Sequence, residues 1–171
     1  MTDEERTRLQ EVLDQFGPAL QRLARSYEEN PSLRADLVQE IYVALVRALP
    51  TFEARCSLRT FVYRVAHNVG ASHAVRATSR RARWVDIEDL DDEPVDVAPA
   101  ADVGLDRRRR VDRLARLIHQ LKPIDRQLTL LFLEGLRTED MAEITGLSAT
   151  HVTTKLSRIR AALTRRMGGG S

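Results

Sequence analysis

Residues 139–163 read EDMAEITGLSATHVTTKLSRIRAAL, and this stretch decides how the C-terminal part of the chain folds. Its spacing predicts two short helices joined by a tight turn. Gly146 is expected to end the first helix, because glycine adopts a positive φ without steric cost. Ser148 is expected to begin the second helix, since its hydroxyl can accept a hydrogen bond from an unpaired backbone N–H. A small Ala142, the glycine at 146 and a β-branched Val152 are spaced as in a helix-turn-helix.

The second of these helices has one apolar face and one basic, hydroxyl-rich face. The apolar residues recur every three or four positions, as in a helix that buries one stripe; they are Val152, Leu156, Ile159 and Leu163. The opposite face carries the candidate DNA contacts: Thr150, His151, Thr153, Thr154, Lys155, Arg158 and Arg160. No acidic residue follows Glu143, whereas a solvated helix face usually mixes both signs. Such a helix suits DNA phosphates and base edges, and a helical hairpin with a solvated polar face is the alternative.

The composition of the 171-residue chain excludes several classes of protein. This length suits one domain or two small ones, and only eight glycines and six prolines beside long apolar periodicities favour helices over sheet. The single cysteine, Cys56, excludes an internal disulfide, and the four histidines are too scattered for a metal site. No apolar run is long enough to span a bilayer and the N-terminus is charged. We therefore expect a cytoplasmic protein without membrane insertion, metal or cofactor.

Charge is distributed along the chain in three blocks. Residues 1–83 carry 13 basic and 10 acidic side chains, residues 84–105 carry eight acidic and no basic ones, and residues 106–171 carry 14 basic and seven acidic ones. An acidic, self-repelling segment with two prolines is typical of an extended linker. We therefore expect an N-terminal domain over 1–83, a flexible acidic linker over 84–105, a C-terminal helix-turn-helix domain over 106–167 and a flexible tail over 168–171.

Three helical segments are expected in the N-terminal domain. The first covers 3–30 and is interrupted at Gly17-Pro18, where proline can begin a new helix. The second covers 36–49 and the third 58–77, each with an apolar face. The polar residues away from the apolar face of the second segment include Asp36, Gln39 and Glu40. In the C-terminal domain, two helices precede the helix-turn-helix, with an expected core of Leu114, Leu117, Ile118, Leu121, Leu128, Leu131 and Phe132.

The helix expected over 58–77 presents a second basic surface. Seven arginines and no acidic residue lie between Ala54 and Arg83. The expected outer face of the helix carries Arg59, Thr60, Tyr63, Arg64, His67, Asn68 and Ser72. Stacking groups and amides on a cationic surface suit unstacked, single-stranded bases. A solvated helix with Tyr63 as a boundary residue is the alternative interpretation.

With both halves taken together, the chain resembles the extracytoplasmic-function class of bacterial RNA polymerase sigma factors, of the sigma-70 family. In the first half the resemblance rests on DLVQE at 36–40, ALPTF at 48–52 and RTFVYRVAHN at 59–68. In the second half it rests on LKPIDRQLTLLFLEGL at 121–136, DMAEITGLS at 140–148 and VTTKLSRIRAAL at 152–163. It implies an all-α fold of two small helical domains, a sigma region 2-like bundle and a sigma region 4-like helix-turn-helix, joined by the acidic linker.

The resemblance also implies roles for residues at matching positions. Asp36, Gln39 and Glu40 fall where the family binds core polymerase. The residues expected to contact the melted −10 element are Arg55, Cys56, Ser57, Arg59, Tyr63, Arg64, His67 and Asn68. Those expected at the −35 duplex are Thr150, His151, Thr153, Thr154, Lys155, Arg158 and Arg160. The implied partners are core RNA polymerase, through its β′ clamp helices and β flap, promoter DNA, and an anti-sigma factor.

Two other classes of function are less consistent with the sequence. A stand-alone helix-turn-helix regulator with an N-terminal sensing or dimerisation domain would need neither the basic stacking helix nor DLVQE at 36–40. An enzyme finds no support, because no Gly-rich phosphate loop, paired-carboxylate site or nucleophile–base pattern occurs, and we expect no catalytic residues. The sequence therefore predicts a subunit that gives RNA polymerase its promoter specificity.

Overall fold

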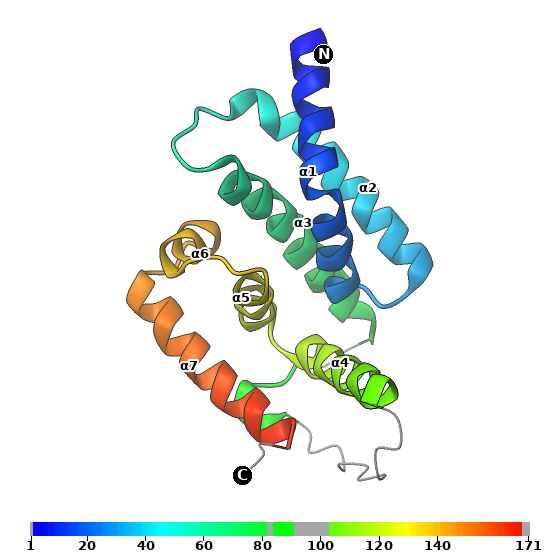
Figure 1. The fold of residues 1–171 in the computed structure, drawn as a ribbon, viewed down its shortest axis with the longest axis vertical. Helices are drawn as coiled ribbons and strands as arrows, with labels where there is room; N and C mark the ends of the chain where they lie inside the picture. Colours follow the sequence, from blue (N-terminus) through cyan, green and yellow to red (C-terminus); the bar gives the residue numbers. More distant parts are fainter. Residues whose placement is uncertain (1, 82–83, 91–102, 169–171) are drawn as a thin grey trace.

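The computed structural model describes residues 2–81, 84–90 and 103–168. These residues form helices and, apart from one isolated bridge between Val85 and Leu121, no β-structure, so the all-α fold is confirmed (Figure 1). The elements are α1 (Asp3–Tyr27), α2 (Pro31–Ala48), η1 (Leu49–Thr51), α3 (Leu58–Arg81), η2 (Ile87–Asp89), α4 (Val103–Gln120), α5 (Pro123–Leu133), α6 (Thr138–Thr145) and α7 (Ala149–Arg166). Within the described ranges, no helix is both long and apolar enough to cross a membrane.

Helices α1, α2 and α3 pack side by side in the N-terminal half. Their bounds differ from expectation, since α1 ends at Tyr27 rather than residue 30 and α3 extends to Arg81 rather than residue 77. Helix α1 is continuous, with Pro18 inside it. Apolar side chains on both sides of the proline enter one core, and this packing offsets the backbone hydrogen bond that proline cannot make; they include Val12, Phe16, Leu20 and Leu23. Helix α2 begins at Pro31 rather than Asp36, because the Asn30 side chain accepts from the backbone N–H groups of Ser32 and Leu33.

The C-terminal half consists of α4 to α7 and the segment 84–90 that precedes it. Val85 donates to the carbonyl of Gln120 at 3.0 Å, and Arg166 in α7 donates to the carbonyl of Leu90 at 2.7 Å. Ile87 and Leu90 are buried. Residues 84–90 therefore do not form the extended linker that their acidic composition predicted, because their apolar residues pack between α4 and α7. Residues 91–102, most of the predicted linker, and residues 169–171 of the predicted tail lie outside the described residues.

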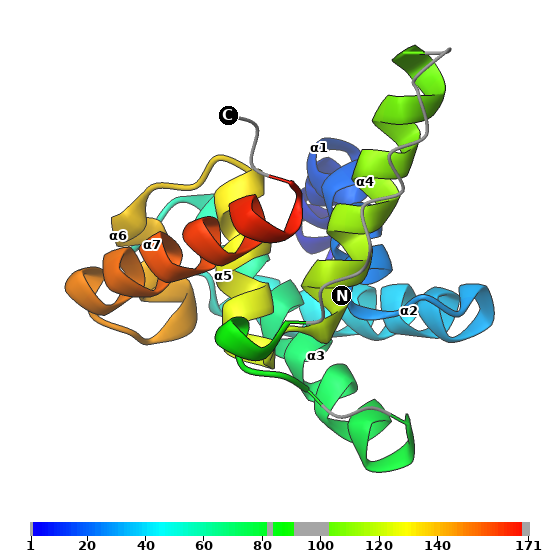
Figure 2. The same ribbon diagram turned by 90° about the horizontal axis from the view of Figure 1, so that it is seen from below.

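One hydrophobic core runs through both halves of the molecule. Helix α3 supplies Val62 and Ala66, and helices α5 and α6 supply Leu131 and Met141 on the other side. Figures 1 and 2 show α5 and α6 lying beside α3, and α4 near the end of α1. The two halves are therefore packed against each other, and α3 provides most of the contact between them, with a smaller contribution from α1.

Buried polar side chains lie on the part of α3 that faces the other helices. His67 is fully buried, its Nδ1 lies 3.0 Å from the Tyr27 hydroxyl, and its ring stacks at 6.1 Å on that of Tyr63. Thr60 and Tyr63 are also buried. The expectation that Thr60, Tyr63 and His67 point outward is therefore wrong, because α1 and the C-terminal half cover that face of α3.

The close approach of α1 to α3 depends on Gly70. A Cβ atom at Gly70 would lie 2.5 Å from Cδ2 of the Tyr27 ring, whereas a Cβ at Gly17 in α1 would meet nothing within 4 Å. We expect Gly70→Ala to cost about 1–3 kcal/mol through overpacking. Gly17→Ala, the matched control, should instead stabilise by about 0.5–1 kcal/mol through helix propensity. Urea unfolding followed by circular dichroism measures both, and stabilisation by both alanines would contradict the packing at Gly70.

Burial of His67 predicts a pH dependence of folding. Burial lowers the pKa of His67 to about 3, whereas a histidine in an unfolded chain titrates near about 6.5. Between these pH values the unfolded chain binds a proton that the native chain excludes. The contribution of neutral His67 to the free energy of unfolding should therefore be fully present above pH about 6.5. Below that pH the free energy of unfolding should fall by up to about 1.4 kcal/mol per pH unit.

His67→Phe removes this titration and should give a flatter pH profile than the unmodified chain. Urea titrations at several pH values between 7.5 and about 4.5 provide the comparison. Parallel profiles for the two proteins would show that His67 is not held neutral in the folded state.

Candidate nucleic-acid interface

The predicted helix-turn-helix is confirmed as local structure. Gly146 follows α6 with a φ of 75°, and its N–H bonds to the carbonyl of Ala142 at 2.9 Å. The hydroxyl of Ser148 accepts from the backbone N–H of His151 at 3.2 Å and caps α7. Val152, Leu156 and Ile159 are buried on the inner face of α7. The turn residues thus fix both helix ends and leave the polar face of α7 toward solvent.

Six of the seven residues predicted on the outer face of α7 are exposed. They are Thr150, His151, Thr153, Thr154, Arg158 and Arg160. Lys155 differs, because its Nζ lies 2.9 Å from the carboxylate of Asp125, whose side chain is only 8% exposed. Lys155 thus neutralises a buried charge in α5, and truncating it would leave that carboxylate unpaired.

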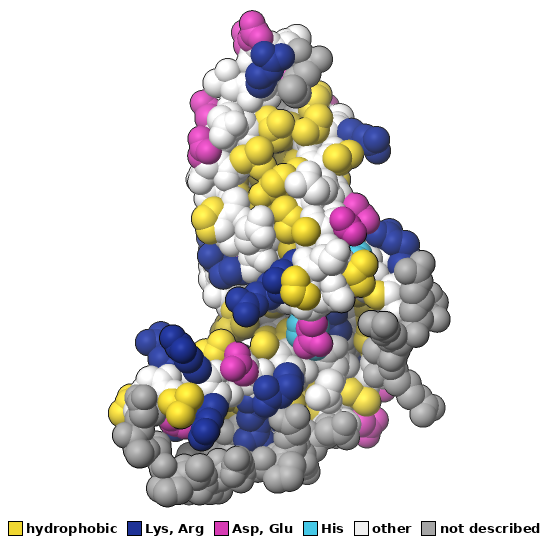
Figure 3. Space-filling view, turned by 90° about the vertical axis from the view of Figure 1, so that its right-hand side faces the viewer, with side chains coloured by type: hydrophobic (Ala, Val, Ile, Leu, Met, Phe, Trp, Pro, Cys, Tyr) yellow, Lys and Arg dark blue, Asp and Glu magenta, His cyan; other side chains and the backbone are white. Residues whose placement is uncertain are grey.

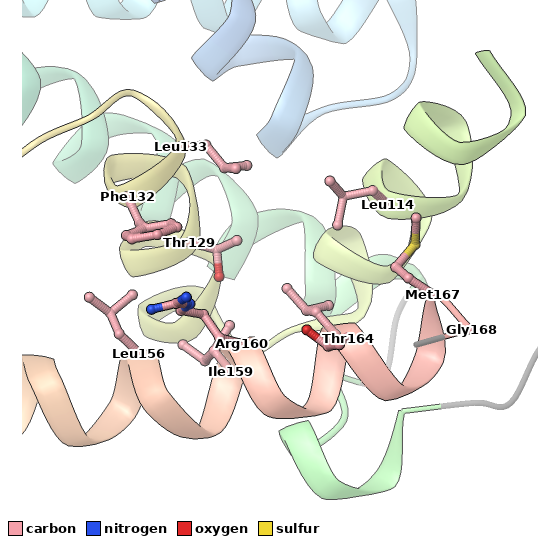
Figure 4. A pocket seen from close by; sticks show the side chains of 11 residues that line it. Leu114, Thr129, Phe132, Leu133, Leu156, Ile159, Arg160, Thr164, Met167 and Gly168 are labelled. Carbon is pink, nitrogen blue, oxygen red and sulfur yellow. The ribbon is translucent and has the colours of Figure 1, made fainter. Parts of the chain in front are cut away.

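An apolar groove of about 320 Å³ lies between α4, α5 and α7 (Figure 4). Leu114 enters it from α4, Phe132 from α5, Ile159 from α7 and Met167 from the residue that follows α7. Phe132 is 41% exposed, with the guanidinium of Arg160 over its ring at 5.4 Å. The expectation that Phe132 belongs to the core is therefore wrong, because it lies near the end of α5 and lines a groove that is open to solvent.

The three residues predicted to bind polymerase line a second groove, between α2 and α3. Asp36, Gln39 and Glu40 form one side. The opposite side, on α3, is formed by Asn68, Val69, Ser72 and Arg76. Glu40 pairs with Arg76 at 2.7 Å across the groove, and both side chains are about half exposed. Val43 in α2 is 48% exposed, and Figure 3 shows a strip of hydrophobic side chains on the upper part of the face it views.

The loop before α3 holds three of the residues predicted to contact the −10 element. The Ser57 hydroxyl accepts from the backbone N–H of Thr60 at 3.0 Å and caps the first turn of α3. Arg55 is exposed and pairs with Glu53 at 2.6 Å. Cys56 is partly buried, and burial together with the nearby Glu143 carboxylate raises the pKa of its thiol.

The remaining predicted −10 residues do not form one surface. Asn68 faces the α2–α3 groove, His67 lies in the core, and Arg59, Tyr63 and Arg64 contact the C-terminal half. The residues predicted on one outer face of α3 therefore lie in three places: the groove, the core, and the polar contact between the halves, here called the seam, where Arg59, Tyr63 and Arg64 meet Glu134 and Glu143.

Glu134, at the C-terminal end of α5, is the centre of that seam. Its carboxylate accepts two hydrogen bonds from Arg22, at 3.0 and 3.1 Å, and one from the Tyr63 hydroxyl at 3.0 Å. Arg59 donates to the Glu134 backbone carbonyl and lies over the Tyr63 ring at 5.7 Å. Glu134 and Arg22 are not among the site residues predicted from the sequence, because their contact joins positions 112 residues apart in the chain.

The seam shifts the titration of the groups that form it. The hydrogen bond from Arg22, joined by that from Tyr63, lowers the pKa of Glu134 below its ordinary value. Burial, reinforced by the Glu134 carboxylate, raises the pKa of Tyr63 to about 12. Glu134 is therefore charged and Tyr63 neutral at pH 7, as a donor–acceptor pair requires. Among the described residues, no cluster of His, Cys, Asp and Glu could hold a metal ion.

Both halves of the chain match models of known protein families. Residues 12–84 match Sigma-70 region 2, and residues 112–163 match Sigma-70, region 4. The ECF RNA polymerase sigma-E factor of Haemophilus influenzae is 32% identical over 132 residues, which cover 73% of this chain and 69% of that protein.

Two solved structures share the fold over nearly the whole chain. The sigma factor RpoE of Bartonella quintana, in complex with the anti-sigma factor NepR, has a TM-score of 0.70 at 21% identity, over 95% of this chain and 98% of the other. CnrH, in complex with the cytosolic domain of CnrY, has a TM-score of 0.68 at 20% identity, over 97% and 91%. With the two family matches and the sigma-E relative, the chain belongs to the extracytoplasmic-function class of the sigma-70 family of RNA polymerase sigma factors.

Proposed function

We propose a division of labour between the surfaces of this sigma factor, which binds core RNA polymerase and directs promoter-specific initiation. The α2–α3 groove contacts the β′ clamp helices of the polymerase. The exposed face of α7 contacts the −35 duplex, and the start of α3 with the loop before it contacts the melted −10 strand. The chemistry of phosphodiester formation belongs to the polymerase, and this chain contributes no catalytic residue.

The observation that carries the proposal is the placement of two exposed polar surfaces on different halves. Asp36, Gln39 and Glu40 converge on one groove, and the outer residues of α7 share one solvent-facing side of a helix-turn-helix. A helix presented in this way fits the major groove of duplex DNA. The stand-alone regulator is not favoured, because residues 12–84 match a sigma region.

Two further partners follow from the same assignment. The β flap of the polymerase is the second contact that we propose on the core enzyme. An anti-sigma factor is the proposed regulatory partner, since the similar structure of the Bartonella quintana protein holds one. Both would be met in the cytoplasm, where the polymerase acts.

Run-off transcription with purified core polymerase tests the proposed function. Promoter-dependent transcripts are expected only when core enzyme and this chain are both present, and the free chain should bind duplex DNA weakly. Tight sequence-specific duplex binding by the free chain, unchanged by polymerase, would contradict the proposal and favour the stand-alone regulator.

The groove assignment predicts the effect of removing its carboxylates. Asp36→Ala and Glu40→Ala should weaken binding to core polymerase. They should change folding stability by less than about 1 kcal/mol, because the residues are exposed and the Glu40–Arg76 pair is a surface pair. Glu11→Ala, an exposed carboxylate on α1, is the control. Titration of labelled core enzyme measures the affinity. Equal affinities for all three variants would show that the α2–α3 groove does not bind the polymerase.

The exposed face of α7 predicts a sequence-dependent loss at the −35 element. Arg158→Ala should cost about 1–3 kcal/mol of promoter binding if Arg158 reads a base, with relaxed preference at one position. Arg165→Ala is the control, because it removes one positive charge from the same helix at its far end. Holoenzyme binding to a library of −35 variants measures both, and indistinguishable profiles would show that Arg158 touches no base.

A further inference from the structure

The outer face of α7 carries two neighbouring threonines whose hydroxyl protons are already used within the helix. The hydroxyl of Thr153 donates to the backbone carbonyl of Ala149, and that of Thr154 donates to the carbonyl of Thr150, both at 3.0 Å. Both threonine side chains are exposed. A hydroxyl has a single proton, so neither threonine can donate it to a base while these bonds are kept. Each side chain still offers a partner its methyl group and an oxygen that can only accept.

Thymine is the base that an exposed methyl group can recognise in the major groove. Its C5-methyl group is an apolar feature of the base edge, and a threonine methyl group makes a favourable contact with it. We propose that Thr153 and Thr154 read thymine methyl groups in the −35 duplex and so favour A·T pairs at the positions they face. The inference rests on the proposed −35 role of α7, and it names the chemical feature of the DNA that this helix selects.

The helical geometry of α7 places Thr154 at the centre of the outer face. A step of two residues turns an α-helix by about 200°. Thr154 lies two residues from Val152 and two from Leu156, which are both buried. Its side chain therefore points away from the core. Arg158 continues the same outward stripe one turn later, and Thr153 lies beside it.

The bonds within the helix also fix where the two methyl groups lie. Threonine is branched at Cβ, so it has few χ1 states in a helix. A hydrogen bond from the hydroxyl to the carbonyl four residues earlier selects among those states. The methyl groups of Thr153 and Thr154 are thus held in place before DNA arrives, and little side-chain freedom is lost on contact.

Other polar groups of α7 are less available to the DNA than the sequence suggests. The ammonium group of Lys155 is held by the Asp125 carboxylate at 2.9 Å, and the guanidinium of Arg160 lies over the Phe132 ring at 5.4 Å. Arg158 is exposed and remains available for a base or a phosphate. Because fewer donors face the duplex, the methyl contacts account for a larger share of the discrimination between bases.

Removing one methyl group from either partner tests the contact. Holoenzyme binding is measured on the preferred −35 sequence from the library above, with each thymidine replaced singly by deoxyuridine. This replacement removes the C5-methyl group and keeps the base pair. At a contacted position it should weaken binding by roughly three- to fivefold, the effect of one buried methyl group.

Thr153→Ser and Thr154→Ser remove the methyl group on the protein side and keep the hydroxyl. In the variant whose contact is lost, deoxyuridine at the matching position should cause little further loss, because its partner is already absent. Thr164→Ser is the matched control. It makes the same change in the same helix, but Thr164 lines the groove between α4, α5 and α7. This control should keep the full response to deoxyuridine.

The outcomes separate the methyl contacts from the proposed function. If deoxyuridine weakens binding equally in the unmodified chain and in both outer-face serine variants, Thr153 and Thr154 do not read thymine. A preferred −35 sequence without any A·T pair would overturn the inference as well. If Arg158→Ala changes the −35 profile while deoxyuridine has no effect in any protein, the −35 role stands and the methyl contacts are wrong. If the holoenzyme does not discriminate among −35 variants, the −35 role fails and the inference fails with it.

Discussion

The carboxylate of Glu134 joins three helices that are distant in the sequence. It receives Arg22 from α1 and Tyr63 from α3 while its own backbone ends α5. Because these donors lower the pKa of Glu134, the charged form is favoured in the closed chain. The contribution of this carboxylate to folding stability is therefore present at neutral pH and is lost only as the pH falls through that lowered pKa. This group therefore joins the two halves at the start of α3.

Below the seam, the contact between the halves is largely apolar and buried. Arg126 in α5 is a buried charged residue within this apolar contact. Its guanidinium donates to the carbonyl of Ile118 at 3.2 Å and to that of Leu121 at 3.4 Å. The same group lies over the Tyr27 ring at 5.9 Å. A buried cation that satisfies the last carbonyls of α4 fixes α4, α5 and α1 relative to one another. The seam at Glu134 is thus the polar rim of a shared core.

Local patterns predicted the parts of the candidate site that one helix or one turn can build. Gly146 and Ser148 fix the helix-turn-helix because backbone conformation and capping depend on the residue itself and its near neighbours. Asp36, Gln39 and Glu40 lie away from the apolar face of α2, so they stay accessible however α2 packs. Prediction failed for Thr60, Tyr63 and His67, since the groups that cover them come from α1, α5 and α6.

By itself, the sequence determined the all-α class, most helix positions, the turn at Gly146 and the exposed basic face of α7. Each of these follows from periodicity or from the conformational preference of one residue. Only the tertiary structure decided that Lys155 neutralises Asp125, that residues 84–90 pack against α7, and that Glu134 engages Arg22 and Tyr63. Those pairs join residues 30 to 112 positions apart. Such contacts form only when distant segments pack into a shared core, and local sequence patterns do not predict them.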